Sequence, residues 1–294
     1  MTNYVTERFG NRASAIYGAD FEGPRENNEV SGPVRRERVI EDIMDISAVA
    51  SRIRSEKVYN IRRALSEACY WGRSIEENQK KPSDQRWIEN FSTGIATITD
   101  LKKFFPTYQI NRASWKFDDI LGEVNRLHGE EGWTPVAGVS ELAKSLASTL
   151  EDTADGKSLK DGDRTSAATK IAIFARPADN VFIWDRLARV AAGLRTADRR
   201  GLTKTVGYSV NGAYGYREFH SDCLVELQTE LENDQFKKAV EDFMAFTEFT
   251  RSGRNSPGLA CRSYFERRLF DKLLVCEGQR IEEIREAGRP PQAV

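Results

Sequence analysis

Residues Asp163 to Val190 read DRTSAATKIAIFARPADNVFIWDRLARV, and this segment predicts two helices joined by a connector. Small and hydroxyl residues open an apolar helix, Pro177 ends it, and a short apolar connector leads to Asp185, a good N-cap for the next helix. Lys170 interrupts the apolar run, where a lysine either reaches past its neighbours to solvent or faces a cleft. Lys170 and Asp185 are therefore a candidate pair, although a capping role alone also explains the aspartate.

Helical spacing of apolar residues extends over most of the remaining chain. It predicts a helical stretch at Pro33–Ala68 with a bend near Ser55, and a helix at 84–105 that Ser83 or Asp84 caps and Pro106 ends. Further helices are predicted around 115–127, from Ser140 onward, at 219–231, at 236–249 and at about 262–285. No long run alternates apolar and polar residues as a strand would, and no unit of about 20 to 50 residues repeats. We therefore expect an all-α fold.

Composition divides the chain into three parts. Residues 1–32 combine glycine, proline and asparagine with few periodic apolar positions and predict an irregular N-terminal arm. Residues 33–154 form an N-terminal helical region, which ends in a turn-rich loop at Asp152–Asp163. Residues 155–294 form the helical region that carries Lys170 and Asp185. With 294 residues, the chain has the length of one or two domains.

The overall composition is that of a globular protein. Hydrophobic residues make up 39% of the chain and charged residues 30%, which excludes wholesale disorder. No apolar run is long enough for a membrane span, and the N-terminus lacks the pattern of a signal peptide, so we expect a cytoplasmic protein without a membrane partner. The cysteines form no Cys-x-x-Cys pair and suggest reduced, buried thiols. We expect no metal site, no iron–sulfur cluster and no cofactor.

Charge is distributed unevenly along the chain, although the net charge is only −1. Residues 155–217 hold 12 Lys and Arg against 6 Asp and Glu, a net of +6, so the remainder holds 32 against 39, a net of −7. Such a basic segment is typical of a phosphate-binding face, but a solvated surface also explains it.

The Lys170 segment resembles the helix-hairpin-helix DNA glycosylase superfamily, in particular its 8-oxoguanine DNA glycosylase-like branch. Thr169-Lys170, an apolar helix, a proline, a connector and the helix-starting Asp185 are similar to the segment that carries the lysine and aspartate of that family. The resemblance continues through Phe182–Arg189 and the closing segment Phe265–Leu274, and covers about 163–279. It implies a helix-hairpin-helix glycosylase-like helical bundle, in one body or in two lobes around a cleft.

The resemblance also implies an activity on DNA, with a role for each matching residue. The enzyme would flip a modified base out of the duplex and excise it through a Schiff base on Lys170, while the ionised Asp185 orients the amine and stabilises positive charge on the sugar. Nearby cations, for which Arg164, Arg176 and Arg186 are candidates, would lower the pKa of the amine. DNA phosphates would bind Arg164, Ser166, Thr169, Arg186 and Arg189, and the flipped base would lie among Trp184, Tyr214, Tyr216 and Phe219.

Two other readings stay open at this point. An enzyme of the same fold that hypermodifies a base in DNA needs the same DNA and the same flipped nucleotide, but no Schiff base. A non-catalytic helical protein that binds DNA or a protein partner needs neither, and in it Lys170 is a surface residue and Asp185 only a cap.

Overall fold

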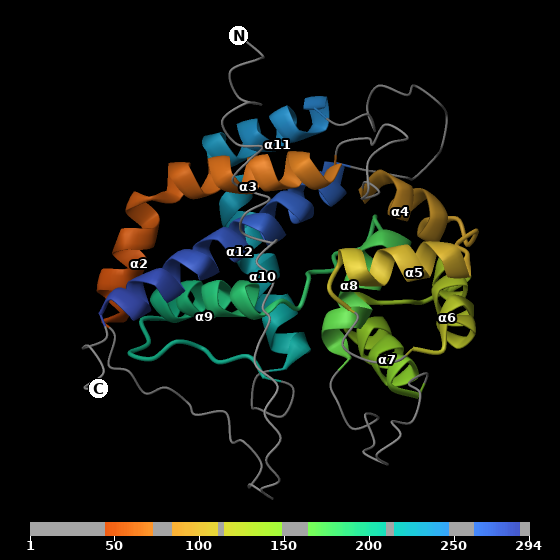
Figure 1. The fold of residues 1–294 in the computed structure, drawn as a ribbon. Coiled ribbons are helices and arrows are strands. Elements are labelled where there is room, and N and C mark those ends of the chain that lie inside the picture. The colour runs from red at the N-terminus through yellow and green to blue at the C-terminus, as the bar shows by residue number, and fades with distance from the viewer. Residues whose placement is uncertain are drawn as a thin grey trace, which may run out of the picture. The chain divides into compact units, whose positions relative to one another are not determined.

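A computed structural model describes residues 45–72, 84–110, 115–148, 164–209, 215–246 and 262–288. In these ranges the chain forms eleven α-helices and no β-strand (Figure 1), so the all-α prediction is confirmed. All of these helices belong to one compact unit, Asp45–Val294. The predicted N-terminal arm and the predicted loop at Asp152–Asp163 lie outside the described residues.

The first two described helices confirm the predicted bend near Ser55. Helix α2 spans Ile46–Ser55 and α3 spans Lys57–Gly72, with Glu56 between them. The Glu56 amide donates to the carbonyl of Arg52 at 3.1 Å, which closes the last turn of α2. The apolar stripe continues across the bend because both helices bury the face that packs against the C-terminal helices.

The predicted single helix at 84–105 is wrong. The chain forms two helices there, α4 at Asp84–Ser92 and α5 at Ile98–Thr107. Gly94, between them, has a φ of 71°, in the left-handed region that favours glycine and does not continue a helix. Pro106 does not stop α5 but lies within its last turn.

A capping box explains why α5 begins anew after this turn. The Thr97 hydroxyl accepts a hydrogen bond from the Asp100 amide at 3.2 Å, and the Asp100 carboxylate accepts one from the Thr97 amide at 3.1 Å. This reciprocal pair satisfies two backbone donors at the helix start, so a single apolar stripe is divided between two helices.

The following pair contains a second correction. Helix α6 spans Phe117–Gly129, as the apolar spacing predicts, and α7 spans Pro135–Ser148. The predicted start at Ser140 is wrong because Pro135, which suits the first turn of a helix, starts α7 five residues earlier.

The remaining helices follow the predicted order. They are α8 (Thr165–Ala175), α9 (Arg186–Arg200), α10 (Tyr216–Leu231), α11 (Asp234–Phe246) and α12 (Arg262–Ala287). The predicted junction of α10 and α11 near Asn233 is confirmed, and the Asn233 side chain accepts from the Gln235 amide at 2.9 Å.

Packing sorts the helices into two groups. Helices α4 to α8 pack mainly on one another, whereas α12 packs along α9 and α3 and is also in contact with α2, α10 and α11 (Figure 1). Each group combines helices from before and after residue 154. The connector between α8 and α9, residues 176–184, is a covalent link from the first group to the second.

Among the described helices, none combines the length and apolar character that crossing a membrane requires. Cys69, Cys223 and Cys276 are free thiols, and Cys261 lies outside the described residues. Burial, with the nearby charge of Asp242, raises the pKa of Cys69 to about 12, so this thiol is unreactive at neutral pH.

Candidate functional site

Side chains from two other helices hold the first half of the 176–184 connector. Arg267 of α12 is fully buried and donates to the carbonyls of Pro177 and Asp179. His220 of α10 lies 2.6 Å from the carbonyl of Asn180 through its Nε2. Burial lowers the pKa of His220, so the ring is neutral near pH 7 and its Nε2–H donates this bond.

The second half of the connector is held in the same way. The Tyr216 hydroxyl donates to the Phe182 carbonyl at 3.2 Å, and the Ile183 amide donates to the Asp271 carboxyl at 3.2 Å. The Trp184 amide donates to the Thr169 hydroxyl of α8 at 3.1 Å. A non-helical segment inside a protein needs such partners for its backbone. The segment that ends at Asp185 is therefore fixed by α8, α10 and α12 together.

Lys170 lies on the accessible side of α8. Of the eleven residues in this helix only Ser166 and Lys170, one turn apart, are partly exposed, and the other nine are buried. The Lys170 ammonium donates to the carbonyl of Tyr108 at the end of α5, at 2.8 Å. Thr169 precedes Lys170 in the chain, and Trp184 precedes Asp185. The hydrogen bond between Thr169 and Trp184 therefore limits the distance between the Cα atoms of Lys170 and Asp185 to at most about 15 Å.

Asp185 caps α9, as predicted. Its backbone is extended and its carboxylate accepts a hydrogen bond from the Leu187 amide at 2.8 Å. The side chain is partly exposed. The partial positive charge of the helix start favours the ionised carboxylate, which suits the role of an anionic partner.

The predicted base-pocket aromatics form one packed cluster. Trp184 is 3% exposed and Phe219 is fully buried, with ring centroids 5.2 Å apart and planes nearly perpendicular. The Tyr216 ring lies 5.9 Å from Trp184, and the Arg189 guanidinium lies over Trp184 at 4.8 Å. Tyr214 lies outside the described residues. Trp184 and Phe219 are covered by their neighbours, whereas Tyr216 and Arg189 are partly exposed at the edge of the cluster.

The residues predicted to bind DNA phosphates make contacts within the protein. Thr169 is fully buried, and its hydroxyl donates to the Ser166 carbonyl at 3.2 Å. Arg186 is exposed and makes a two-pronged ion pair with Glu282, and Arg189 donates to the Tyr208 carbonyl at 2.7 Å. Arg164 is partly buried, with its guanidinium 5.8 Å from the Trp115 ring.

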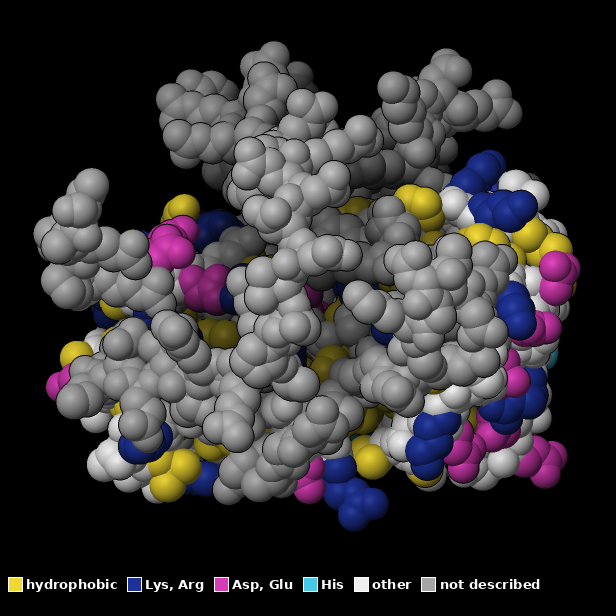
Figure 2. Space-filling model, turned by 60° about the horizontal axis from the view of Figure 1, so that its bottom comes forward, with side chains coloured by type: hydrophobic (Ala, Val, Ile, Leu, Met, Phe, Trp, Pro, Cys, Tyr) yellow, Lys and Arg dark blue, Asp and Glu magenta, His cyan; other side chains and the backbone are white. Residues whose placement is uncertain are grey.

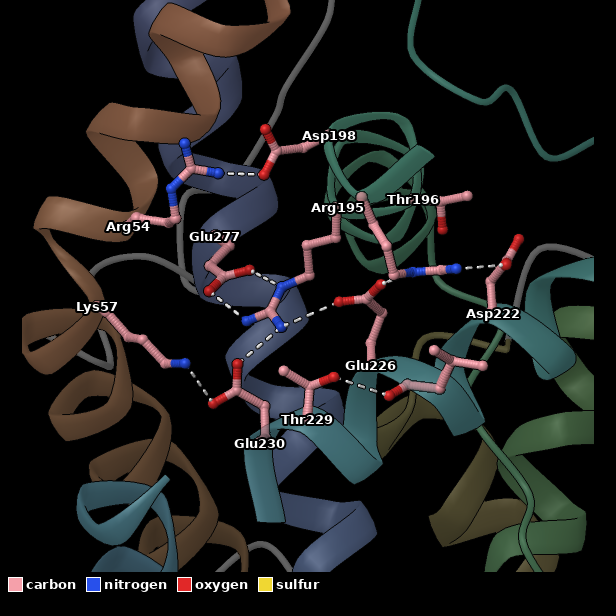
Figure 3. Close-up of polar contacts among 12 residues, drawn as sticks. Arg54, Lys57, Arg195, Thr196, Asp198, Asp222, Glu226, Thr229, Glu230 and Glu277 are labelled. Atoms are coloured by element: carbon pink, nitrogen blue, oxygen red, sulfur yellow. Dashed lines mark hydrogen bonds and ion pairs between the residues drawn. The ribbon is translucent and has the colours of Figure 1, made fainter. Parts of the chain in front are cut away.

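A buried ion-pair network takes up much of the positive charge of the basic segment (Figure 3). Arg195 of α9 lies between Glu277 of α12, at 2.7 Å, and Glu230 of α10, at 2.8 Å. Glu230 is 1% exposed and also pairs with Lys57 of α3 at 3.0 Å. Burial alone would lower the pKa of Arg195, but Glu277 and Glu230 raise it well above its ordinary value, so the guanidinium is permanently charged.

Two further arginines of α9 extend this network. Arg199 pairs with Glu226 at 2.8 Å and with Asp222 at 3.0 Å, and Arg200 pairs with Asp222 at 2.6 Å. The carboxylates belong to α10, outside the 155–217 segment. On the face drawn in Figure 2, the described basic and acidic side chains that can be seen also lie next to one another. The local excess of +6 is thus balanced in large part by helices that follow in the sequence.

A second buried cluster supports the residue that accepts from Lys170. Asp84, fully buried at the start of α4, binds Arg268 of α12 at 2.7 Å, Tyr264 at 3.1 Å and the hydroxyl of Tyr108. Burial and the negative charge of Asp84 hold the pKa of Tyr108 far above its ordinary value, so its hydroxyl stays protonated. Asp84 therefore joins α4 and the end of α5 to α12, and Ser83, the other candidate cap, lies outside the described residues.

Sequence reasoning missed the residues that fix the connector, above all Arg267, Asp271 and His220. The signal was present in Phe265–Leu274, FERRLFDKLL, where five charged residues alternate in groups with apolar ones. Three of them, Arg267, Arg268 and Asp271, are no more than 2% exposed. Charges at such positions need partners, and each of these three binds a group on another segment of the chain.

No group of three or more His, Cys, Asp and Glu side chains in the described ranges has an arrangement that could hold a metal ion. Comparison with protein-family models, curated proteins and solved structures found no match to this chain.

Proposed function

We propose that the protein is a DNA-binding enzyme of the DNA glycosylase/lyase type, which excises a flipped-out modified base through an imine on Lys170. The observation that supports this best is the hydrogen bond from the Trp184 amide to the Thr169 hydroxyl, at 3.1 Å. It ties the connector to α8 one residue before each member of the candidate pair. With the two Cα atoms at most about 15 Å apart, the length of a lysine side chain, about 6 Å, is enough for the Lys170 amine to approach a sugar ring that also contacts Asp185.

In this mechanism the lone pair of the Lys170 amine forms a bond to C1′ of the flipped nucleotide. The glycosidic bond breaks, and the base leaves with its electron pair and takes up a proton. Opening of the sugar ring gives a protonated imine, from which loss of the C2′ proton expels the 3′ phosphate. The Asp185 carboxylate stabilises the positive charge that develops on the sugar. Before attack, the amine must be neutral and must leave the Tyr108 carbonyl.

Borohydride trapping tests this proposal, because borohydride reduces an imine to a stable amine. The substrates are duplex oligonucleotides that contain either an abasic site or 8-oxoguanine. We expect the wild-type protein to form a covalent adduct that peptide mapping assigns to Lys170. Lys170→Ala should abolish the adduct, while Lys102→Ala, at an exposed lysine of α5, should leave it unchanged. The proposal fails if no substrate is trapped, or if Lys170→Ala is trapped as well as wild type.

One observation favours a second candidate, a non-catalytic helical protein that binds DNA or a protein partner, and of these two it favours the protein partner. Four arginines of α9 that would give the segment its affinity for phosphates, Arg186, Arg195, Arg199 and Arg200, pair with carboxylates inside the protein. If this candidate is correct, the wild-type protein forms no adduct and Lys170→Ala binds its partner as well as wild type does. A base-hypermodification enzyme would bind a flipped base and lose its activity in Lys170→Ala or Asp185→Asn, again without an adduct.

A further inference from the structure

Asp271 is a buried carboxyl group whose bonding is only half complete. It lies on α12, is 2% exposed, and accepts the Ile183 amide proton through Oδ1 at 3.2 Å. Its second oxygen, Oδ2, is buried and has no hydrogen-bond partner among the residues that the structure describes. A carboxylate with an unsatisfied oxygen in the interior is costly, whereas a neutral carboxylic acid is much less so.

The charged and titratable groups around Asp271 come from its own helix and from α10. Arg268, Arg267 and Lys272 of α12 favour the ionised form, while Tyr216 and Cys223 of α10 are protonated neighbours. Both arginines bind other groups, Arg268 the Asp84 carboxylate and Arg267 the connector carbonyls. Burial outweighs the three cations and the Ile183 hydrogen bond, all of which favour the ionised form, and raises the pKa of Asp271 to about 7.

We propose that Asp271 is a positioning residue for the candidate site: it holds the end of the connector through Ile183, and the closed connector, which shields the carboxyl group from water, is most stable when that group is protonated. Ile183 stands two residues before Asp185, so the bond fixes the backbone from which the Asp185 side chain projects. The link from connector to activity rests on the proposed function. The link from protonation to connector does not, because it concerns this chain alone.

The direction of the pH effect follows from the pKa of the carboxyl group in each state. In the closed connector the pKa is about 7. An opening that lets water reach the carboxyl group would return its pKa toward the ordinary value of 3.8. Between these values the closed form binds more protons than the open form. Opening therefore becomes easier as the pH rises toward 7, and the effect levels off above it.

Hydrogen exchange of the Ile183 and Trp184 amides measures this opening directly. After correction for the intrinsic exchange rate, wild-type protection should fall by up to about tenfold per pH unit between about pH 5 and pH 7. Asp271→Asn keeps an oxygen to accept from Ile183 but cannot ionise, so its protection should not fall as the pH rises through this window. His220, which holds Asn180 and has a lowered pKa, is present in both proteins and can only raise protection as the pH rises. Asp242→Asn, a substitution of an exposed carboxylate on α11, should behave as wild type.

The trapping assay then separates the two proposals. The ratio of the wild-type adduct rate to the Asp271→Asn adduct rate should fall as the pH rises toward 7, because only wild type loosens. Two results would overturn the role of Asp271. One is a ratio of the two adduct rates that does not change with pH, and the other is hydrogen exchange with the same pH dependence in wild type and Asp271→Asn. Exchange that behaves as expected without any adduct would instead remove the glycosylase proposal and leave the proton-dependent connector in place.

Discussion

Thr169 shows how one side chain can set the geometry of the candidate pair. Thr169 is fully buried, and its hydroxyl makes two hydrogen bonds: it donates to the Ser166 carbonyl within α8 and accepts from the Trp184 amide of the connector. The family resemblance implies a phosphate contact for this residue. In the folded chain the hydroxyl satisfies a buried backbone amide that has no helical partner.

Thr169→Val is expected to lower the free energy of unfolding by about 1 to 3 kcal/mol, because valine has the same shape but leaves the Trp184 amide unsatisfied. Thr169→Ser keeps the hydroxyl and loses only a methyl group, so it should cost less than Thr169→Val. Urea denaturation compares the variants, and equal stabilities for wild type and Thr169→Val would show that the bond contributes nothing.

Lys272 is a second residue of α12 for which burial disfavours the charged form of the side chain. Burial, with the charge of Arg268 one turn away, lowers the pKa of Lys272 from 10.5 to about 8. Below about pH 8 the amine is protonated in both the folded and the unfolded chain, and the folded chain carries the full cost. Between about 8 and 10.5 the unfolded chain binds more protons, so this group makes stability rise with pH.

Lys272→Met is therefore expected to raise the free energy of unfolding at pH 7 by about 1 to 3 kcal/mol and to remove the rise above pH 8. Denaturation at several pH values checks both effects. Lys238→Met, at an exposed residue of α11, is the matched control and should change neither. A variant at Lys272 that is less stable than wild type at pH 7 would contradict the expected cost of this charge.

At the scale of elements, α9 and α12 approach each other closely. Gly278 permits it, because a Cβ atom there would lie 2.2 Å from the carbonyl oxygen of Leu187. This atom belongs to the backbone of α9 and cannot turn aside. The two helices bring together Arg195 and Glu277, so the spacing also sets the geometry of the ion-pair network.

Gly278→Ala should consequently destabilise the protein by about 1 to 3 kcal/mol, since the added methyl group forces the helices apart. Gly122→Ala is the control: the position lies within α6 and a Cβ there meets nothing within 4 Å. Alanine favours a helix by about 1 kcal/mol over glycine, so this variant should be as stable as wild type or more stable. Melting temperatures that shift equally in both variants would refute the steric argument.

Elements were predictable from the sequence where local chemistry defines them. The end of α8 at Pro177, the cap at Asp185 and the junction at Asn233 each depend on residues within a few positions, and all three are confirmed. The division of 84–105 was missed because the apolar stripe passes through the break, and only Gly94 and the Thr97 capping box mark it. The candidate pair was found from one segment, but its supports were not, because they lie about 35 to 90 residues further along the chain.

At the scale of the whole molecule, the network of Figure 3 links the basic segment to carboxylates of α10 and α12. Arg195, Glu230 and Glu277 connect α9, α10 and α12, and Lys57 adds α3. An uneven charge along the sequence thus becomes an internal bond between distant helices and does not have to create a charged surface. This pairing could not be predicted from charge counts, which do not show which helices meet.

Glu277→Gln is expected to cost about 3 to 5 kcal/mol, because it leaves Arg195 charged and partly unpaired in the interior. Glu282→Gln breaks the exposed pair with Arg186 and should cost no more than about 1 kcal/mol. Chemical denaturation of both variants at low and high salt makes the comparison, and only the Glu282 effect should be weakened by salt. Similar costs for the two would show that burial does not strengthen the Glu277 pair.

The connector also has a consequence for how the protein matures during synthesis. The groups that hold Pro177, Asp179 and Ile183 belong to α12, the last of the described helices to leave the ribosome. Domains acquire their structure as the chain emerges, and contacts between distant parts of the sequence must wait for the later part. A nascent chain that already contains Lys170 and Asp185 has both side chains, but it cannot set their geometry until some hundred further residues have been translated.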